Sequence, residues 1–117
     1  MKALSIKPPW VNMIVRGLKT IETRTWPTTY RGPLLLVTSK TVDKDAPWPQ
    51  VPDLPLGYAV ATCQLVDCRA MGAGDYVQAR CPWGYGLYSW ILTDIKSIVP
   101  FSVRGRLGLY EIEVPHD

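Results

Sequence analysis

Three charged residues, Lys19, Glu22 and Arg24, fall within six positions near the start of the chain. A carboxylate flanked by cations is favoured in its ionised form, and a neighbouring arginine lowers the pKa of a lysine. Such a lysine can act as a base or activate a hydroxyl group, here that of Thr20 or Thr23. The carboxylate can alternatively accept hydrogen bonds from the amino group of a nucleobase. From the spacing alone, a network of surface ion pairs is the simpler interpretation.

A short helix is predicted immediately before these residues. Apolar residues recur at helical spacing from Trp10 to Leu18, and the two prolines ahead of them suit a first helical turn. Gly17 favours a left-handed cap at the end of this helix. Lys19 therefore lies at the junction between the helix and the next segment, from which its side chain can turn to either side.

The next segment, residues 20–26 (TIETRTW), is rich in β-branched residues and predicts a strand. In an extended chain Glu22, Arg24 and Trp26 project from one face, because successive side chains point to opposite sides. The Trp26 ring is then placed where a nucleobase can stack on it. The same ring also suits the core of a β-rich domain, so both interpretations stay open.

The rest of the chain predicts a small, mainly β domain. A proline-rich segment at about 41–57 predicts an irregular loop, and the glycine-rich turn 71–75 leads into a short irregular or helical piece. We therefore expect a single α+β domain over residues 1–117, because this length suits one core. Its architecture would be a barrel of five or six mostly antiparallel strands, with the N-terminal helix plugging one end. Further strands are expected at 2–7, 33–40, 58–69, 85–95 and 106–114.

The positive charge of the chain is unevenly distributed. The first 40 residues hold seven basic residues and one acidic residue, whereas the remainder holds six basic and nine acidic residues. A basic first third fits an anionic partner such as a phosphate backbone. Arg104 and Arg106 flank Gly105 and can also meet phosphates, although a solvated loop is the simpler interpretation of these two residues.

Several classes of site are not supported by the residue types. The three cysteines lack metal-ligand spacing, His116 is the sole histidine, and neither a P-loop nor a dinucleotide-binding glycine motif is present. We therefore expect neither a metal nor a cofactor, and no histidine-based catalytic triad. No apolar run has the length of a membrane span and no secretory signal is recognised, so we expect no contact with a membrane. Cysteines interpreted as reduced thiols favour a cytoplasmic protein.

The string ALSIKPPWVNMIVRGLKTIETRTW resembles the start of ASCH domains, a family named for a region of a transcriptional coactivator. Two later stretches also resemble the family: Ser39-Lys40 is similar to an Ala-Ser-Lys-like turn after a strand, and a Gly-x-Leu-Gly-Leu signature begins at Gly105. The family hallmark, Gly-x-Lys-x-x-Glu-x-Arg, falls on Gly17, Lys19, Glu22 and Arg24.

This resemblance implies a PUA-like β-barrel with a cleft that is lined by the motif residues. The family is associated with RNA and with the recognition of modified nucleosides. We accordingly expect a module that binds RNA or a modified nucleoside. The candidate ligand-binding residues are Lys19, Glu22, Arg24, Trp26, Ser39 and Lys40.

The resemblance also implies an enzymatic alternative. One small bacterial branch of the family removes the acetyl group from N4-acetylcytidine with a Lys, a Thr nucleophile and a distant Glu. Lys19 matches that Lys, whereas the Thr falls at Glu22, and Asp75 is a loose counterpart of the distant Glu. The alternative is therefore a metal-independent hydrolase of a nucleoside amide or of RNA, with these three residues as its catalytic candidates. Because the hydroxyl group is missing at position 22, we favour binding over catalysis.

Overall fold

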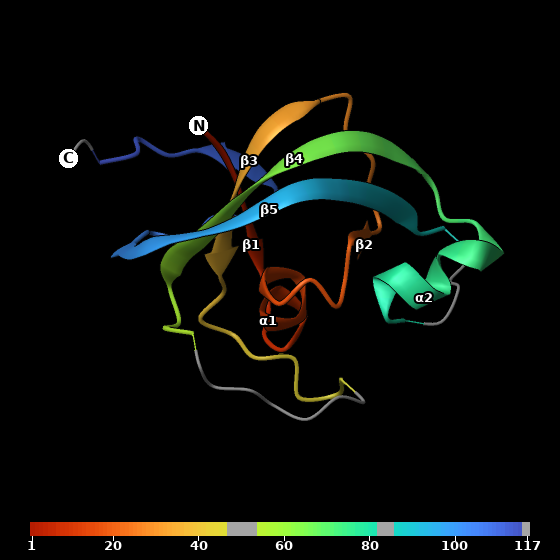
Figure 1. The fold of residues 1–117 in the computed structure, drawn as a ribbon, viewed down its shortest axis with the longest axis horizontal. Coiled ribbons are helices and arrows are strands. Elements are labelled where there is room, and N and C mark those ends of the chain that lie inside the picture. The colour runs from red at the N-terminus through yellow and green to blue at the C-terminus, as the bar shows by residue number, and fades with distance from the viewer. Residues whose placement is uncertain (47–53, 82–85, 116–117) are drawn as a thin grey trace.

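The computed structural model describes residues 1–46, 54–81 and 86–115, which form one curled sheet with short helices (Figure 1). A mainly β class with five or six strands was predicted, and the structure confirms it with six strands among the described residues. In chain order the elements are β1 (Lys2–Ile6), α1 (Trp10–Val15), β2 (Ile21–Arg24), β3 (Gly32–Thr38), β4 (Tyr58–Ala70), the 3-10 helix η1 (Ala73–Asp75), α2 (Tyr76–Ala79), β5 (Tyr88–Ser102) and β6 (Leu109–Glu111).

The strands are ordered β2-β5-β4-β3-β1-β6 across the sheet. Strands β1 and β3 are parallel, and all other neighbouring pairs are antiparallel. Strands β4 and β5 are the longest, with 13 and 15 residues, and both cross the molecule as curved ribbons (Figure 1). Shifts of register along this pair mark irregularities that bend and twist the strands. The sheet therefore curls into a half-barrel.

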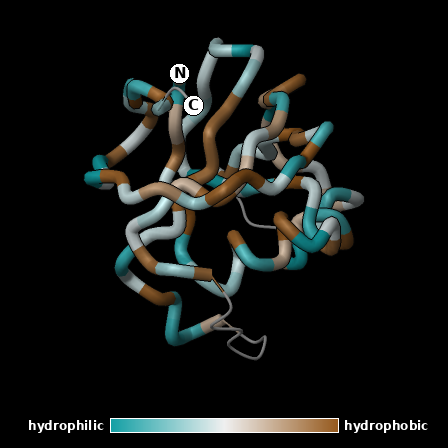
Figure 2. Tube along the Cα trace, turned by 60° about the vertical axis from the view of Figure 1, so that its left-hand side comes forward, coloured by the Kyte–Doolittle hydropathy of each residue, from teal (hydrophilic) through white to brown (hydrophobic). Residues whose placement is uncertain are grey.

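The main core lies between α1 and the concave side of the curled sheet. Helix α1 contributes Val11 and Ile14, both fully buried, and Trp90 of β5 is the largest side chain that is fully buried there. Apolar segments run along the central strands, whereas most hydrophilic segments lie in turns and loops (Figure 2). The other buried members of this core are Leu4, Ile6, Leu34, Leu36, Val60, Ala61, Cys63, Leu65 and Leu92.

Helix α1 ends with the left-handed cap that was predicted from Gly17. Gly17 has a φ of +76°, a backbone conformation that glycine adopts without steric cost. The amides of Gly17 and Leu18 donate to the carbonyls of Ile14 and Met13 at 2.9 Å each, which satisfies carbonyls at the end of the helix. The chain then turns directly into β2, and Lys19 lies in this connection.

Strand β2 is shorter than the expected 20–26, and β5 and β6 differ most in length from the sequence expectation. Strand β5 continues to Ser102, well beyond the expected end at 95, because β4 still pairs with it after β2 has ended. Strand β6 is shorter than 106–114, because residues 103–108 form a loop in front of it. Residues 47–53 of the expected proline-rich loop and the expected first residue of β5, Tyr85, lie outside the described residues. In the described part of the chain, no helix has the length and apolar character needed to cross a bilayer.

Candidate functional site

A cavity of about 870 Å³ opens beside β2 and the ends of β1 and β3. Strands β1 and β3 are parallel neighbours, so the segments that follow them leave the sheet side by side. The amide of Ser39 donates to the carbonyl of Ile6 at 3.0 Å and holds these two segments together. The described residues that line the cavity include all six ligand-binding candidates: Lys19, Glu22, Arg24, Trp26, Ser39 and Lys40.

Glu22 lies at the inner wall of this cavity, with only 6% of its surface exposed. Its Oε1 lies 3.5 Å from Nζ of Lys19, and its Oε2 lies 3.1 Å from Nη2 of Arg24. The same Nη2 donates to the backbone carbonyl of Ser5 at 2.8 Å. Both carboxylate oxygens therefore face cations. The hydrogen bond to Ser5 in β1 holds the guanidinium group of Arg24 in this position.

The side chain of Lys19 is almost completely buried and turns into the molecule. Its Nζ donates to the carbonyl of Ala79 in α2 at 2.5 Å and lies 5.3 Å from the centroid of the Trp10 ring. Burial lowers the pKa of Lys19, and the nearby Glu22 partly opposes this effect. From the sequence, Arg24 was expected to lower the pKa of Lys19. In the structure Arg24 does lower this pKa, but it contributes less than burial does.

Aromatic side chains form part of the cavity wall. Trp26 is half-buried and meets Trp90 edge to face, with ring centroids 4.8 Å apart and an interplanar angle of 84°. Trp90 is fully buried and donates from Nε1 to the carbonyl of Trp26 at 3.3 Å. Trp10, which also lines the cavity, donates from Nε1 to Oδ2 of Asp43 at 2.8 Å, and this bond lowers the pKa of Asp43. Trp26 therefore both contacts the core and borders the cavity.

Lys40 lies at the exposed edge of the cavity and packs across Gly57. A Cβ atom at position 57 would lie 2.8 Å from Cε of Lys40, so a residue larger than glycine would displace the Lys40 side chain. The amide of Gly57 donates to the carbonyl of Thr38 at 2.7 Å. The chain that enters β4 thus supports the chain that leaves β3.

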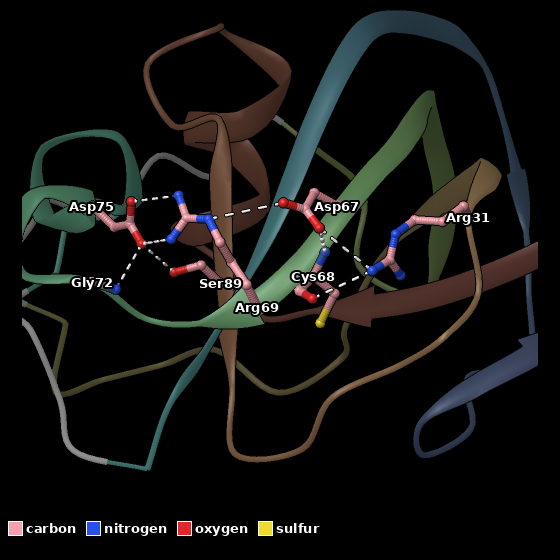
Figure 3. A network of polar contacts seen from close by, with 7 residues as sticks. All are labelled: Arg31, Asp67, Cys68, Arg69, Gly72, Asp75 and Ser89. Atoms are coloured by element: carbon pink, nitrogen blue, oxygen red, sulfur yellow. Dashed lines mark hydrogen bonds and ion pairs between the residues drawn. The ribbon is translucent and has the colours of Figure 1, made fainter.

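The structure does not bring Asp75 to the other two catalytic candidates. Asp75 receives two hydrogen bonds from Arg69, at 2.6 and 2.9 Å, and one each from the Gly72 amide and the Ser89 hydroxyl (Figure 3). Ser89 precedes Trp90 in β5, so its side chain points away from the face on which Trp90 packs. Asp75 is absent from the described residues that line the cavity.

The network around Asp75 ties loops to the sheet. Nε of Arg69 also lies 3.9 Å from Oδ2 of Asp67, and Oδ1 of Asp67 lies 3.5 Å from Nη2 of Arg31 (Figure 3). These contacts connect the start of β3, the end of β4 and η1. The Arg69 guanidinium beside Asp75 holds the pKa of that carboxyl well below its ordinary value.

Several wall residues were not singled out as site residues from the sequence. Cys81 borders the cavity with its Sγ 3.7 Å from Oγ1 of Thr23, and the loop before β6 contributes Arg104 and Arg106. No local pattern signals Cys81, whereas Arg104 and Arg106 were considered from the sequence as possible phosphate contacts, with a solvated loop as the simpler interpretation. In total the described wall carries six cationic side chains and two carboxylates: Lys7, Lys19, Arg24, Lys40, Arg104 and Arg106 with Glu22 and Asp43.

The cavity therefore combines a buried carboxylate, aromatic faces and a cationic edge. This set can accept hydrogen bonds at its inner wall, stack a flat ring and attract an anion at its mouth. Within the described ranges, no three His, Cys, Asp or Glu side chains are grouped so that they could hold a metal ion.

The chain is similar to curated proteins and to solved structures. Activating signal cointegrator 1 from Homo sapiens is 32% identical over 56% of this chain, and the Mus musculus protein gives the same values. The chain spans 14% of the length of each of these relatives. The crystal structure of ASCH from Zymomonas mobilis has a TM-score of 0.67 at 14% identity, over 96% of this chain and 87% of that one.

A point mutant of the same Zymomonas mobilis protein has a TM-score of 0.66 at 13% identity, over 96% of this chain and 89% of that one. At this level of identity the likeness establishes the fold. The family model of the ASCH domain matches residues 4–102, which is most of the sequence. The chain belongs to the ASCH domain family.

Proposed function

We propose that this protein binds a nucleoside, either free or within RNA, with the base held in the cavity against Glu22. The observation that carries this proposal is the buried carboxylate at the inner wall, between Lys19 and Arg24. Each carboxylate oxygen has two lone pairs and, among the described residues, one cation partner, so acceptor capacity is left for the amino group of a base. A buried acceptor of this kind discriminates strongly between bases that do and do not donate.

The size of the cavity and the residues that line it favour a flat ligand such as a nucleobase. A volume of about 870 Å³ lies within the range of small-molecule sites. Trp10 and Trp26 border it with half-buried rings, and such rings suit contact with a base. The association of ASCH domains with RNA and modified nucleosides points to the same class of ligand.

The test is calorimetric titration with cytidine, N4-acetylcytidine, adenosine and guanosine. In the Glu22→Gln variant, affinity for the nucleoside that binds best should fall by about 10- to 100-fold, because a hydrogen bond to a charged group contributes about 1.5–3 kcal/mol. Glu111→Gln is the matched control, because Glu111 pairs with Met1 and Lys2 and is absent from the described cavity wall. Saturable binding by neither protein, or equal affinity in the wild type and Glu22→Gln, would contradict the proposal.

A second candidate function is a metal-independent hydrolase of an acylated nucleoside or of RNA. The observation that favours it is the buried Lys19 amine beside Glu22 in the cavity wall. Burial lowers the pKa of Lys19, and an amine that releases its proton more readily is a better candidate for a general base toward water or the Thr23 hydroxyl. In this candidate Glu22 orients the amine, whereas Asp75 holds η1 on the sheet and takes no part in the reaction. Incubation with N4-acetylcytidine and a short RNA, followed by mass spectrometry, should then show products that a Lys19→Met variant does not form.

A further inference from the structure

The loop between β5 and β6 forms an exposed part of the cavity wall. Residues 104–108 all line the cavity, although they lie more than 80 positions from Lys19 and Glu22 in the chain. The loop is pinned at both ends: the amide of Val103 donates to the carbonyl of Gly57 at 2.9 Å, and the Tyr110 hydroxyl lies 2.6 Å from Oγ of Ser5. Val103 and Tyr110 are themselves buried. The exposed part of the loop between them is therefore held in place.

Gly105 brings the backbone of this loop against β1. A Cβ atom at position 105 would lie 3.3 Å from Oγ of Ser5, which is a tight contact. The backbone carbonyl of the same Ser5 accepts the hydrogen bond from Arg24, which in turn pairs with Glu22. The loop is thus connected to Glu22 through Ser5 and Arg24, and it lines the same cavity.

The two arginines of the loop differ from every other arginine in the described chain. Arg104 and Arg106 make no ion pair or hydrogen bond within the described ranges, and both are exposed. The remaining arginines all have an interaction: Arg16, Arg24, Arg31, Arg69 and Arg80. Lys40, at the same edge of the cavity, likewise has no partner among the described residues.

We propose that Arg104 and Arg106 form a phosphate subsite, which binds a phosphate ester attached to the nucleoside in the cavity. This inference rests on the proposed function. Guanidinium groups match phosphate oxygens with paired hydrogen bonds, and a cationic mouth above an acidic inner wall orients a ligand with its base inward and its phosphate outward. The phosphate can belong to a mononucleotide or to an RNA strand, and the two sources are distinguished by experiment.

The test compares cytidine, cytidine 5′-monophosphate and hexacytidylate RNA by titration at several salt concentrations. The double variant Arg104→Gln/Arg106→Gln should bind the phosphorylated probes about tenfold less tightly or worse, with cytidine affinity unchanged. If a strand occupies the subsite, the slope of log affinity against log salt should become shallower by about 0.7 for hexacytidylate, the value for one phosphate contact on a single strand. If the arginine variant loses as much affinity for cytidine 5′-monophosphate as for hexacytidylate, the subsite binds a terminal phosphate.

The double variant Lys2→Gln/Lys96→Gln is the matched control, because it removes the same charge outside the described cavity wall. Equal affinities of the arginine variant and this control for both phosphorylated probes would overturn the subsite and leave the nucleoside site standing. Binding of hexacytidylate that needs the arginines but is insensitive to Glu22→Gln would instead overturn the nucleoside site alone. Absence of binding by the wild type to all three probes would overturn both.

Discussion

Lys19 and Glu22 form an ion pair at the inner wall of the cavity that is almost completely removed from solvent. Nζ of Lys19 lies 3.5 Å from Oε1 of Glu22, and the two side chains are 2% and 8% exposed. Removing two charges from water is costly, so a pair like this is weak evidence for stability and better evidence for a functional constraint. Arg24 also pairs with Glu22, and the carbonyl of Ala79 accepts a hydrogen bond from Lys19.

Lys19 should make the stability of the protein depend on pH in the alkaline range. Its pKa is lowered from 10.5 in the folded state, chiefly by burial, so the unfolded chain binds more protons as the pH approaches 10.5. Stability rises with pH wherever the unfolded state binds more protons. The contribution of Lys19 to the free energy of unfolding should therefore increase with pH up to about 10.5 and then level off.

Urea unfolding between neutral pH and pH 10.5 measures this contribution in the wild type and in Lys19→Met. The variant retains a buried chain of similar length, and Arg24 still pairs with Glu22, so the rise with pH should be smaller than in the wild type. Lys96→Met is the control, since the Lys96 side chain is 69% exposed. Identical pH profiles for the wild type and Lys19→Met would contradict the prediction.

The Glu22→Gln substitution should lower the pKa of Lys19 further. Glu22 raises that pKa both by its charge and by hydrogen bonding, and glutamine removes the charge while keeping the shape. The measurement is the titration of the Lys19 ¹³Cε chemical shift by NMR, whose midpoint should move to lower pH in the variant. Glu111→Gln should leave this midpoint in place, and a midpoint that is unchanged in Glu22→Gln would show that the pair contributes little.

The strands and the first helix could be predicted from sequence because their signals are local. Gly17 ends α1 with a positive φ, and the alternation of 20–26 placed Glu22 and Arg24 on one face. The direction of Lys19 could not be predicted, because the carbonyl that binds it belongs to Ala79, sixty positions later. Such a contact depends on how α2 packs beside β2.

The same reason explains why the sequence predicted neither that the loop 103–108 reaches the cavity nor that Asp75 pairs with Arg69. The pairing of Tyr110 with Ser5 brings the loop 103–108 to the cavity across a separation of 105 residues. Asp75 was placed among the catalytic candidates because of its position in the chain, whereas its actual partner is Arg69 at the end of β4. Side-chain pairing across the sheet decided both positions, and no local pattern encodes it.

Asp75→Asn should destabilise the protein without changing nucleoside binding. The carboxylate receives two hydrogen bonds from Arg69 and one each from Gly72 and Ser89, and an amide cannot accept them all. We expect a loss of about 1–3 kcal/mol in the free energy of unfolding, as for other disrupted buried hydrogen bonds. Asp94→Asn, at a side chain that is 57% exposed, is the control.

The pH dependence of this contribution has the same sign as that of Lys19, because both pKa values are lowered on folding, but it falls in the acid range. The pKa of Asp75 is lowered from 3.8 in the folded state by Arg69, so the contribution is complete above pH 3.8 and is lost as the pH falls below that value. The difference in stability between the wild type and Asp75→Asn should therefore shrink in acid. Weaker nucleoside binding by a folded Asp75→Asn protein would contradict the prediction and indicate that Asp75 contributes to the binding site.

Gly57→Ala should weaken the edge of the cavity by two separable effects. Gly57 has a φ of +78°, which costs a residue with a Cβ about 1 kcal/mol, and the new methyl group would lie 2.8 Å from Cε of Lys40. Gly17→Ala is the matched control, because Gly17 has a φ of +76° but no neighbour within 4 Å of the added atom. Thermal unfolding should show a loss in both variants.

The contact with Lys40 is isolated by adding Lys40→Ala to each glycine variant. If the Lys40 side chain packs on Gly57 as described, the added substitution should relieve part of the loss in Gly57→Ala and none in Gly17→Ala. The Gly57→Ala variant should also bind hexacytidylate less tightly than Gly17→Ala does, because its lysine is displaced from the cavity edge. Equal stability and equal binding of the two glycine variants would mean that Lys40 is not positioned by Gly57.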